Sequence, residues 1–325
     1  MDTVDRRRFL KIAGVSLGAG ALYQVAAPAF GEGGRLMRLL GKKNGETPTP
    51  FSFVQFSDTH VGFDGPPDPL GTQAFERAVE MVNALPERPE LVLFTGDLTH
   101  DSEKPGEHAD RMRLFRKIAS RLEVPLVKCV PGEHDAALDG GVLFRDAFGE
   151  THYSFDHRGV HFIALDNVSR GKPIVGKEQL AWLTADLARF PKSAPIVVFT
   201  HRPLFDLRPD WEWFTGDGDQ VMNALAPYEN VTVLYGHIHR EHVHTEANAT
   251  HYAARSLIFA FPDPASDAPK KPLPFDPAKP FQNLGVRRVA ERAGARPAIE
   301  QVELTLREFS GTVGIQQILK EGEGL

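Results

Sequence analysis

Five short polar motifs, each placed directly after a short apolar run, constrain this chain more than any other feature. The runs end at Phe56, Phe94, Val130, Phe199 and Tyr235. Short runs rich in Val and Phe are typical of buried strands. The motifs that follow are Ser-Asp-Thr-His, Thr-Gly-Asp, Pro-Gly-Glu-His-Asp, Thr-His-Arg-Pro and Gly-His-Ile-His. Because ligands bind beyond the carboxyl ends of strands in open α/β sheets, we expect all five motifs at one edge.

The chemistry of these motifs indicates a site for two metal ions. Alternate residues of an extended segment point to the same side, so Asp58 can face the metals together with His60, and His237 together with His239. His and carboxylate ligands suit zinc, iron or manganese. A carboxylate can bridge two metals about 3.5–4 Å apart. The single Cys129 excludes a disulfide framework, a Cys-rich zinc site and an iron–sulfur cluster.

The ordered set Asp-x-His, Gly-Asp, Gly-x-His-Asp, His and Gly-His-x-His, spanning about residues 51–239, resembles the calcineurin-like metallophosphoesterase family. Any one motif is weak evidence, but five in this order are highly specific. The resemblance implies an α/β sandwich of two mixed β-sheets flanked by helices. It also implies an enzyme that hydrolyses phosphate monoesters or diesters with a dinuclear metal centre and a metal-bridging hydroxide.

The resemblance also implies a role for each motif residue. Asp58, His60 and His239 would hold the first metal, and Asp97 would bridge the two. The second metal would be held by His201, His237 and Glu133. His134 would protonate the leaving-group oxygen as general acid, and Asp135 would orient His134.

Glu133 departs from the family pattern, which has Asn at this position. With Asp58, Asp97 and a hydroxide, Glu133 gives a ligand charge of −4, against −3 with Asn. Our hypothesis is that Glu133 ligates and shifts the preference toward a trivalent ion such as Fe(III), although the metal pair stays open among Fe, Mn and Zn. The alternative is a non-catalytic protein that binds metal or a phospho-ligand through an altered site.

Substrate contacts are expected from two residues beside the motifs. Arg202 follows His201 and could bind a phosphate oxygen, since Arg suits bidentate anion binding. His100 and its neighbour Asp101 lie just past the Asp97 turn, so one of them could reach substrate. The loop 209–214 carries two tryptophans, which either fold over the core or stack on a base or an acyl chain of the substrate. Stacking on an acyl chain would be consistent with a lipid-processing hydrolase.

Strand and helix patterns alternate along the chain, which favours a single α/β domain with more than one sheet. Besides the five runs, strands are expected at 256–261, 285–289 and 298–306, and a hairpin at 152–155 and 160–165. His242 and His244 alternate as a further strand would place them. Helices are expected at 73–85, 108–122, 178–190 and 220–226, and the Pro-rich stretch 262–280 is interpreted as a surface loop.

The N-terminus resembles an export signal. Residues 6–11 read Arg-Arg-Arg-Phe-Leu-Lys and match the twin-arginine pattern Arg-Arg-x-Phe-Leu-Lys, and residues 12–31 carry no charge before Glu32. Ala27-Pro28-Ala29 supplies the small residues of a cleavage site. The alternatives are an uncleaved membrane anchor and an ordinary surface helix. A twin-arginine signal implies export in folded form and a periplasmic or extracellular location, with the twin-arginine translocation machinery as a partner.

These interpretations divide the chain into a signal peptide at 1–29, a linker at 30–50, a metallophosphoesterase domain at 51–310 and a C-terminal tail at 311–325. A formal net charge of −6 argues against nucleic-acid binding, which usually requires a basic surplus. The expected partner in catalysis is a small-molecule phosphoester. No stable membrane span is expected if the signal is cleaved.

Overall fold

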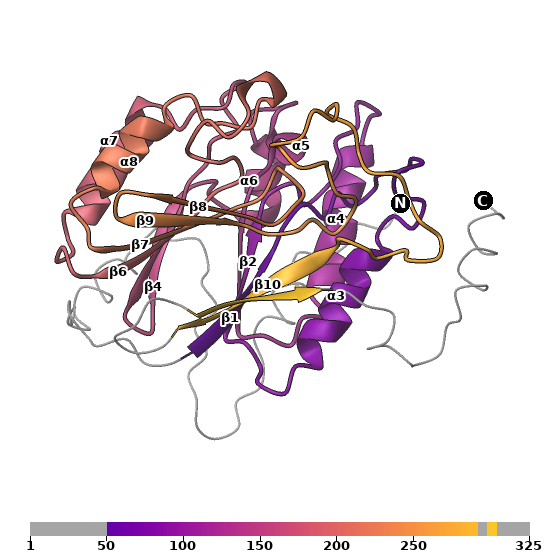
Figure 1. Ribbon diagram of the computed structural model, residues 1–325, viewed down its shortest axis with the longest axis horizontal. Coiled ribbons are helices and arrows are strands. Elements are labelled where there is room, and N and C mark those ends of the chain that lie inside the picture. The colour runs from indigo at the N-terminus through magenta and orange to yellow at the C-terminus, as the bar shows by residue number, and fades with distance from the viewer. Residues whose placement is uncertain (1–50, 292–297, 304–325) are drawn as a thin grey trace, which may run out of the picture. The chain divides into compact units, whose positions relative to one another are not determined.

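Two β-sheets form the centre of the protein in the computed structural model, which describes residues 51–291 and 298–303 (Figure 1). The predicted signal peptide, linker and tail lie outside the described residues. The first sheet has the strand order β11-β10-β1-β2-β3. Its strands are β1 (Phe51–Phe56), β2 (Leu91–Thr95), β3 (Leu126–Val130), β10 (Gly285–Glu291) and β11 (Ala298–Glu303). β1, β2 and β3 are parallel, and β10 is antiparallel to β1.

The second sheet has the order β4-β5-β6-β7-β9-β8. Its strands are β4 (Tyr153–His157), β5 (Val160–Ala164), β6 (Pro195–Phe199), β7 (Asn230–Tyr235), β8 (His242–Glu246) and β9 (Ala249–Ala253). β5, β6, β7 and β9 are parallel, whereas β4 and β8 are antiparallel edge strands. Arg158 and Gly159 link β4 to β5 with φ of 52° and 82°, the left-handed values that a two-residue hairpin turn requires.

Helices cover the outer face of each sheet. α3 (Gln73–Asn83) and α4 (Glu107–Ala119) pack on the first sheet, and α7 (Lys177–Leu187) and α8 (Gly218–Leu225) pack on the second (Figure 1). Two short helices, α5 (Glu133–Ala136) and α6 (Val142–Phe148), follow β3, and the 3₁₀ helix η1 (Pro209–Trp211) follows β6. The order of layers is therefore helix, sheet, sheet, helix.

The inner strands β1, β2, β5, β6 and β7 are mostly apolar on both faces because both faces of the sheet are covered there. In β1, Val54 and Phe56 join the core under α3 and α4, whereas Phe51 and Phe53 join the core between the sheets. This alternation is the two-residue period of a strand. It explains why these runs read as continuous apolar stretches in the sequence.

The described residues confirm the predicted sandwich of two mixed sheets and most of its elements. The strand expected at 256–261 is wrong: this segment has no ladder, and its backbone bonds individually to other segments, as Leu257 N does to Asp58 O at 3.1 Å. β9 was not predicted, since Ala-Thr-His-Tyr-Ala lacks a strong apolar pattern. Among the described residues, no helix has the length and apolar character needed to cross a membrane.

Candidate metal centre

The predicted ligands all lie just past the carboxyl ends of parallel strands. Asp58 and His60 follow β1, Asp97 follows β2, and Glu133 follows β3 in the first sheet. The ligands from the second sheet are His201 after β6, and His237 with His239 after β7. The structure therefore brings the five motifs together at one edge, as the strand pattern predicts.

Backbone strain is concentrated at these positions. A positive φ is uncommon for residues other than Gly, and strained backbone clusters at functional sites. Of the nine described non-Gly residues with positive φ, five are predicted ligands: Asp58 (51°), His60 (39°), Asp97 (47°), His237 (66°) and His239 (52°). The fold thus holds these side chains in place at an energetic cost.

Asp58, His60, Asp97 and His239 form the first group of donors, with one ligand atom each and all four atoms within 4.8 Å of one another. All four residues are buried. Nε2 of His60 lies 3.2 Å from Nε2 of His239, and Oδ1 of Asp58 lies 3.4 Å from the same His239 atom. Two nitrogens and two carboxylates converging at this spacing can hold one metal ion.

Glu133, His201 and His237 form the second group, again within 4.8 Å. Oε2 of Glu133 lies 2.8 Å from Nε2 of His201, yet neither atom has a hydrogen bond of acceptable geometry although both are buried. Oε1 of Glu133 lies 2.9 Å from Nδ1 of His237. Buried polar atoms are rarely left unsatisfied. These converging donors therefore fit a second cation between them.

Asp97 lies between the two groups. Its Oδ2 is 3.3 Å from Nε2 of His60 and 3.4 Å from Nε2 of His201, one histidine from each group. Its Oδ1 accepts a hydrogen bond from the backbone N–H of His134 at 3.0 Å, which fixes the carboxylate. Asp97 is therefore placed to contact both cations, as the bridging role requires.

Two histidines of the centre are oriented by backbone carbonyls. Nδ1 of His201 donates to the carbonyl of Thr95 at 2.8 Å, and Nδ1 of His239 donates to the carbonyl of Phe259 at 2.9 Å. Each bond fixes the tautomer of the neutral ring, in which Nε2 carries no proton and can ligate, as is usual for metal-binding histidines. Phe259 belongs to the segment that does not form the predicted strand, so that segment wraps the site instead.

Close packing at the centre requires glycine at several motif positions, among them Gly96 and Gly236. A Cβ on Gly96, whose φ is +92°, would lie 2.3 Å from Nδ1 of His201. A Cβ on Gly236 would lie 1.9 Å from Oγ of Ser57 and 2.6 Å from Oδ2 of Asp58. The motif glycines therefore allow the two sheets to bring their ligands together.

The charges of the second group match metal binding. Burial opposes ionisation of Glu133, but His237 and His201 hold its pKa well below the ordinary value. Burial likewise opposes protonation of His201, yet the carboxylates of Asp97 and Glu133 raise its pKa well above the ordinary value. A cation that displaces this proton would take over the attraction of both carboxylates.

His134 lies beside the centre but is oriented by a different carboxylate from the one expected. We expected Asp135 to orient it, whereas the structure gives the contact with Nδ1 of His134 to Asp101. Burial opposes the charged imidazolium, but Asp97, Asp101 and Glu133 raise the pKa of His134 to about 9. Despite partial burial, the hydrogen bond with His134 lowers the pKa of Asp101 to about 2. A protonated His134 is suited to general acid catalysis.

Asp135 instead joins two loops of the centre. Its carboxylate accepts hydrogen bonds from the backbone N–H groups of Leu98, Thr99 and Gly132, each at 2.9 Å, and from the Thr99 hydroxyl at 2.9 Å. Asp135 is fully buried. It therefore fixes the loop that carries Asp97 against the loop that carries Glu133 and His134.

The expected substrate residues lie at the centre but already have protein partners. Nη2 of Arg202 lies 3.3 Å from Oε1 of Glu133, and Nη1 donates to the carbonyl of Glu212 at 2.8 Å. Nδ1 of His100 lies 3.2 Å from Nδ1 of His60, and the His100 ring stacks on His134 with ring centroids 4.5 Å apart. Both residues therefore border the site: Arg202 contacts the predicted ligand Glu133, and His100 contacts the predicted ligand His60 and the predicted acid His134.

The tryptophan loop folds over the core. Trp211 and Trp213 are 5% and 0% exposed, and they pack with Tyr235, Ile238 and Ala253. The indole rings meet edge to face, with centroids 4.8 Å apart. The loop therefore presents neither ring for stacking on a base or an acyl chain.

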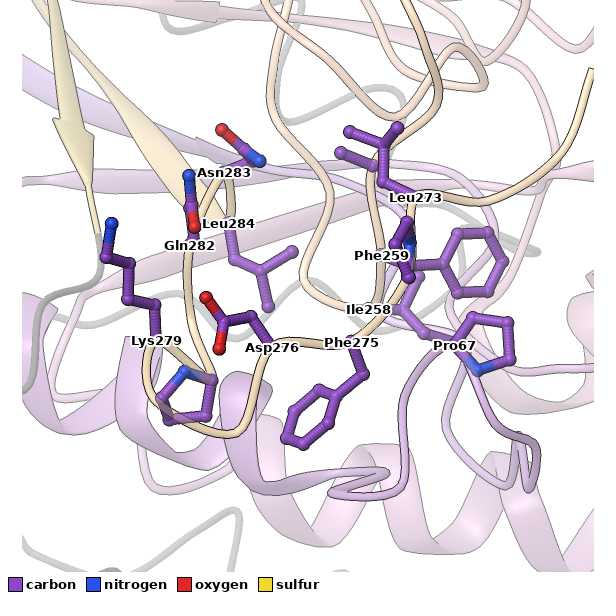
Figure 2. Close-up of a pocket in the computed structure, with 13 residues that line it drawn as sticks. Pro67, Ile258, Phe259, Leu273, Phe275, Asp276, Lys279, Gln282, Asn283 and Leu284 are labelled. Carbon is purple, nitrogen blue, oxygen red and sulfur yellow. The ribbon is translucent and has the colours of Figure 1, made fainter.

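A small cavity of about 50 Å³ lies beside Phe259 (Figure 2). Pro67 and residues from the stretches 258–260 and 273–284 line it, with Leu273 and Phe275 among the apolar residues and Lys279 and Asp276 among the polar ones. Phe259 also packs against His239, with ring centroids 4.9 Å apart. None of the predicted metal ligands is among its lining residues, so this pocket is separate from the two donor groups.

The fold and the paired donor groups define a metallophosphoesterase. The chain belongs to the calcineurin-like phosphoesterase family, whose model matches residues 51–241, and it is a phosphoesterase of this family. A probable glycerophosphodiester phosphodiesterase from Arcobacter nitrofigilis is 29% identical over 201 residues, which cover 58% of this chain and 71% of that protein. A serine/threonine-protein phosphatase from Mus musculus is 29% identical over 231 residues, covering 61% of this chain and 72% of that protein.

The solved structures show the same fold. A dimetal phosphatase from Danio rerio superposes with a TM-score of 0.53 at 15% sequence identity. The superposition covers 77% of this chain and 99% of the Danio rerio chain. At this identity the likeness extends to the fold alone. The fold expected from the motifs is therefore confirmed independently of the sequence pattern.

Proposed function

We propose that this protein hydrolyses phosphate monoesters or diesters at a dinuclear metal centre held by Asp58, His60, Asp97, Glu133, His201, His237 and His239. One observation carries the proposal. A single carboxylate oxygen, Oδ2 of Asp97, lies 3.3 Å from a histidine of one donor group and 3.4 Å from a histidine of the other. A shared carboxylate of this kind is the feature that couples two metal ions into one site.

The residues of the chain divide the work around that centre. Two bound metal ions would orient the phosphate and supply a hydroxide nucleophile by lowering the pKa of bound water. His134 holds a proton next to the centre and gives it to the departing oxygen. Asp101 keeps Nδ1 of His134 protonated and fixes the ring, so Nε2 is the nitrogen that faces the leaving group.

The substrate is a small phosphoester in this proposal. The relatives support both ester classes: one is a probable glycerophosphodiester phosphodiesterase and another a serine/threonine-protein phosphatase. The cavity beside Phe259 is lined by none of the proposed ligands, so it gives no preference between the two classes. The choice between monoester and diester is therefore an experimental one.

The test is a panel of nitrophenyl phosphate monoesters, diesters and cyclic esters, assayed with metal content measured on the same sample. We expect turnover that a chelator abolishes and that His134→Ala lowers by at least about 100-fold with its metal retained. His152→Ala, outside the centre, is the matched control. Full metal loading without turnover of any ester would favour the alternative, a non-catalytic binding protein with a site altered at Glu133.

We further propose that the protein is exported by the twin-arginine pathway to the periplasm or beyond. The support is the match of residues 6–11 to the Arg-Arg-x-Phe-Leu-Lys pattern. Cell fractionation of the full chain and of the Arg6→Lys, Arg7→Lys double variant tests this. Export of the double variant at the unchanged level would contradict a twin-arginine signal.

A further inference from the structure

Glu133 adds a negative charge to the centre that the Asn found at this position in the family pattern would not add. Asp58 and Asp97 are buried, and Glu133, whose side chain is 23% exposed, adds a third carboxylate with its Oε2 buried. Burying a charge without a partner is costly, so a third carboxylate needs a nearby cation when no metal is bound. The structure supplies one in Arg202, which lies directly after His201 in the chain.

Arg202 contacts Glu133 through one oxygen. Its Nη2 lies 3.3 Å from Oε1, the oxygen that also faces Nδ1 of His237 at 2.9 Å. Oε2 of Glu133 faces Nε2 of His201 and has no hydrogen-bond partner. The two oxygens of Glu133 therefore have different surroundings. Arg202 and His237 contact Oε1, whereas Oε2 points into the donor group of the second metal.

Arg202 is itself held rigidly. Its Nη1 donates to the carbonyl of Glu212 at 2.8 Å, and its backbone N–H donates to Oδ1 of Asn167 at 3.3 Å. Nδ2 of Asn167 donates back to the carbonyl of Arg202 at 3.0 Å. Arg202 is 9% exposed. A guanidinium fixed in this way is positioned for Glu133 and leaves little of its surface for a substrate.

We propose that Arg202 is a positioning residue that neutralises Glu133 and presents its Oε2 as a single oxygen ligand, in the manner of the Asn amide oxygen. The inference rests on the proposed metal centre. With Arg202 included, three carboxylates and one guanidinium give the centre a charge of −2, as two carboxylates and a neutral Asn would. The extra charge on which our preference for Fe(III) rested is thereby cancelled, and a divalent pair becomes the expected content.

A double-mutant cycle in the full chain, freed of metal with a chelator, tests the coupling without any assay of activity. Arg202→Gln should lower Tm by about 3–6 °C more when Glu133 is present than in the Glu133→Asn background. Both backgrounds lose the contact with Glu212, so that contribution cancels. Arg202→Lys should recover part of the loss only when Glu133 is present. Equal losses in both backgrounds would overturn the proposal and assign Arg202 a structural role at Glu212.

Kinetics separate this role from a substrate contact. In the Glu133→Asn background, Arg202→Gln should leave KM for a nitrophenyl phosphoester within about 2-fold, because Arg202 no longer has a carboxylate to position. A rise in KM of about 10-fold or more in that background would show that Arg202 binds substrate and would overturn the proposal. If the unaltered protein lacks activity, the proposed function fails, whereas the metal-free cycle still decides the pairing of Arg202 with Glu133.

Discussion

The carboxylate of Asp101 accepts a hydrogen bond from Nδ1 of His134, which makes Asp101 the nearest anion to the proposed general acid. Arg111 holds the loop that carries Asp101, since its Nη1 donates to the carbonyls of His100 at 3.0 Å and Asp101 at 2.7 Å. The loop position is thus fixed by a helix of the outer layer, α4. The position of the proposed acid, His134, depends in this way on a contact remote from the ligand motifs.

Asp101→Asn should reduce kcat by about 10-fold while leaving metal content unchanged. Asn keeps the shape of the side chain but removes the charge that stabilises the imidazolium of His134. Measurements of kcat, KM and metal content on one preparation check this, with the exposed Asp146→Asn as a control for loss of one negative charge. Unaltered kcat in Asp101→Asn would mean that Asp101 does not support His134 in the reaction.

The residues of the two donor groups could be predicted from the sequence because the carboxyl ends of parallel strands converge at one edge, independently of the paths of the loops. Asp101 could not be assigned in this way, because its contact depends on the path of a loop held by Arg111. The misassignment of Asp135 has a different cause. His134 and Asp135 are neighbours in the helix α5, and adjacent helical residues point in directions about 100° apart. His134 therefore faces Asp101, and Asp135 faces the loop after β2.

The segment 256–261 shows a second limit of sequence reasoning. Its apolar composition is that of a strand, but its N–H and C=O groups bond to separate partners, among them Nδ1 of His239 at the carbonyl of Phe259. Composition cannot tell a strand from an apolar segment that wraps a site. The position of Arg202 against Glu133 is likewise set by tertiary contacts with Asn167 and Glu212.

Asp135→Asn should destabilise the metal-free protein by about 2–4 kcal/mol. Asn has one acceptor oxygen, so its amide nitrogen would meet two of the four donors that now converge on the carboxylate. Urea unfolding of the variant and of Asp146→Asn measures the difference. Equal stability of the two variants would show that the hydrogen bonds of Asp135 to the two loops contribute little to the free energy of unfolding.

Gly236→Ala should abolish binding at the first donor group, since the added Cβ would lie 2.6 Å from Oδ2 of Asp58 and displace that ligand. Gly216→Ala is the matched control, because its Cβ would meet atoms only at 3.4–3.8 Å, which is ordinary contact distance. Metal content after dialysis distinguishes the two variants. Retention of the full metal content by Gly236→Ala would contradict the assignment of Asp58 as a ligand.

Asp68 stands apart from the metal centre and sets a pH dependence of folding stability. One oxygen accepts a hydrogen bond from the backbone N–H of Leu70 at 3.0 Å, whereas Oδ2 is buried without a partner. Burial raises the pKa of Asp68 from 3.8 to about 7. Between these two values the folded state keeps a proton that the unfolded state has lost. Stability therefore falls as the pH rises through this window, and the full penalty applies above about pH 7.

Asp68→Asn removes this titration, because the amide is neutral at every pH and its oxygen can still accept the bond from Leu70. The variant should gain stability relative to the unaltered protein as the pH rises from about 4 to about 7, by no more than about 4 kcal/mol. Urea unfolding of the metal-free proteins at pH 5 and pH 8 measures the gain, with the exposed Asp64→Asn as the control. The same difference at both pH values would show that Asp68 ionises alike in the folded and unfolded chain, since only a shifted pKa makes the difference depend on pH.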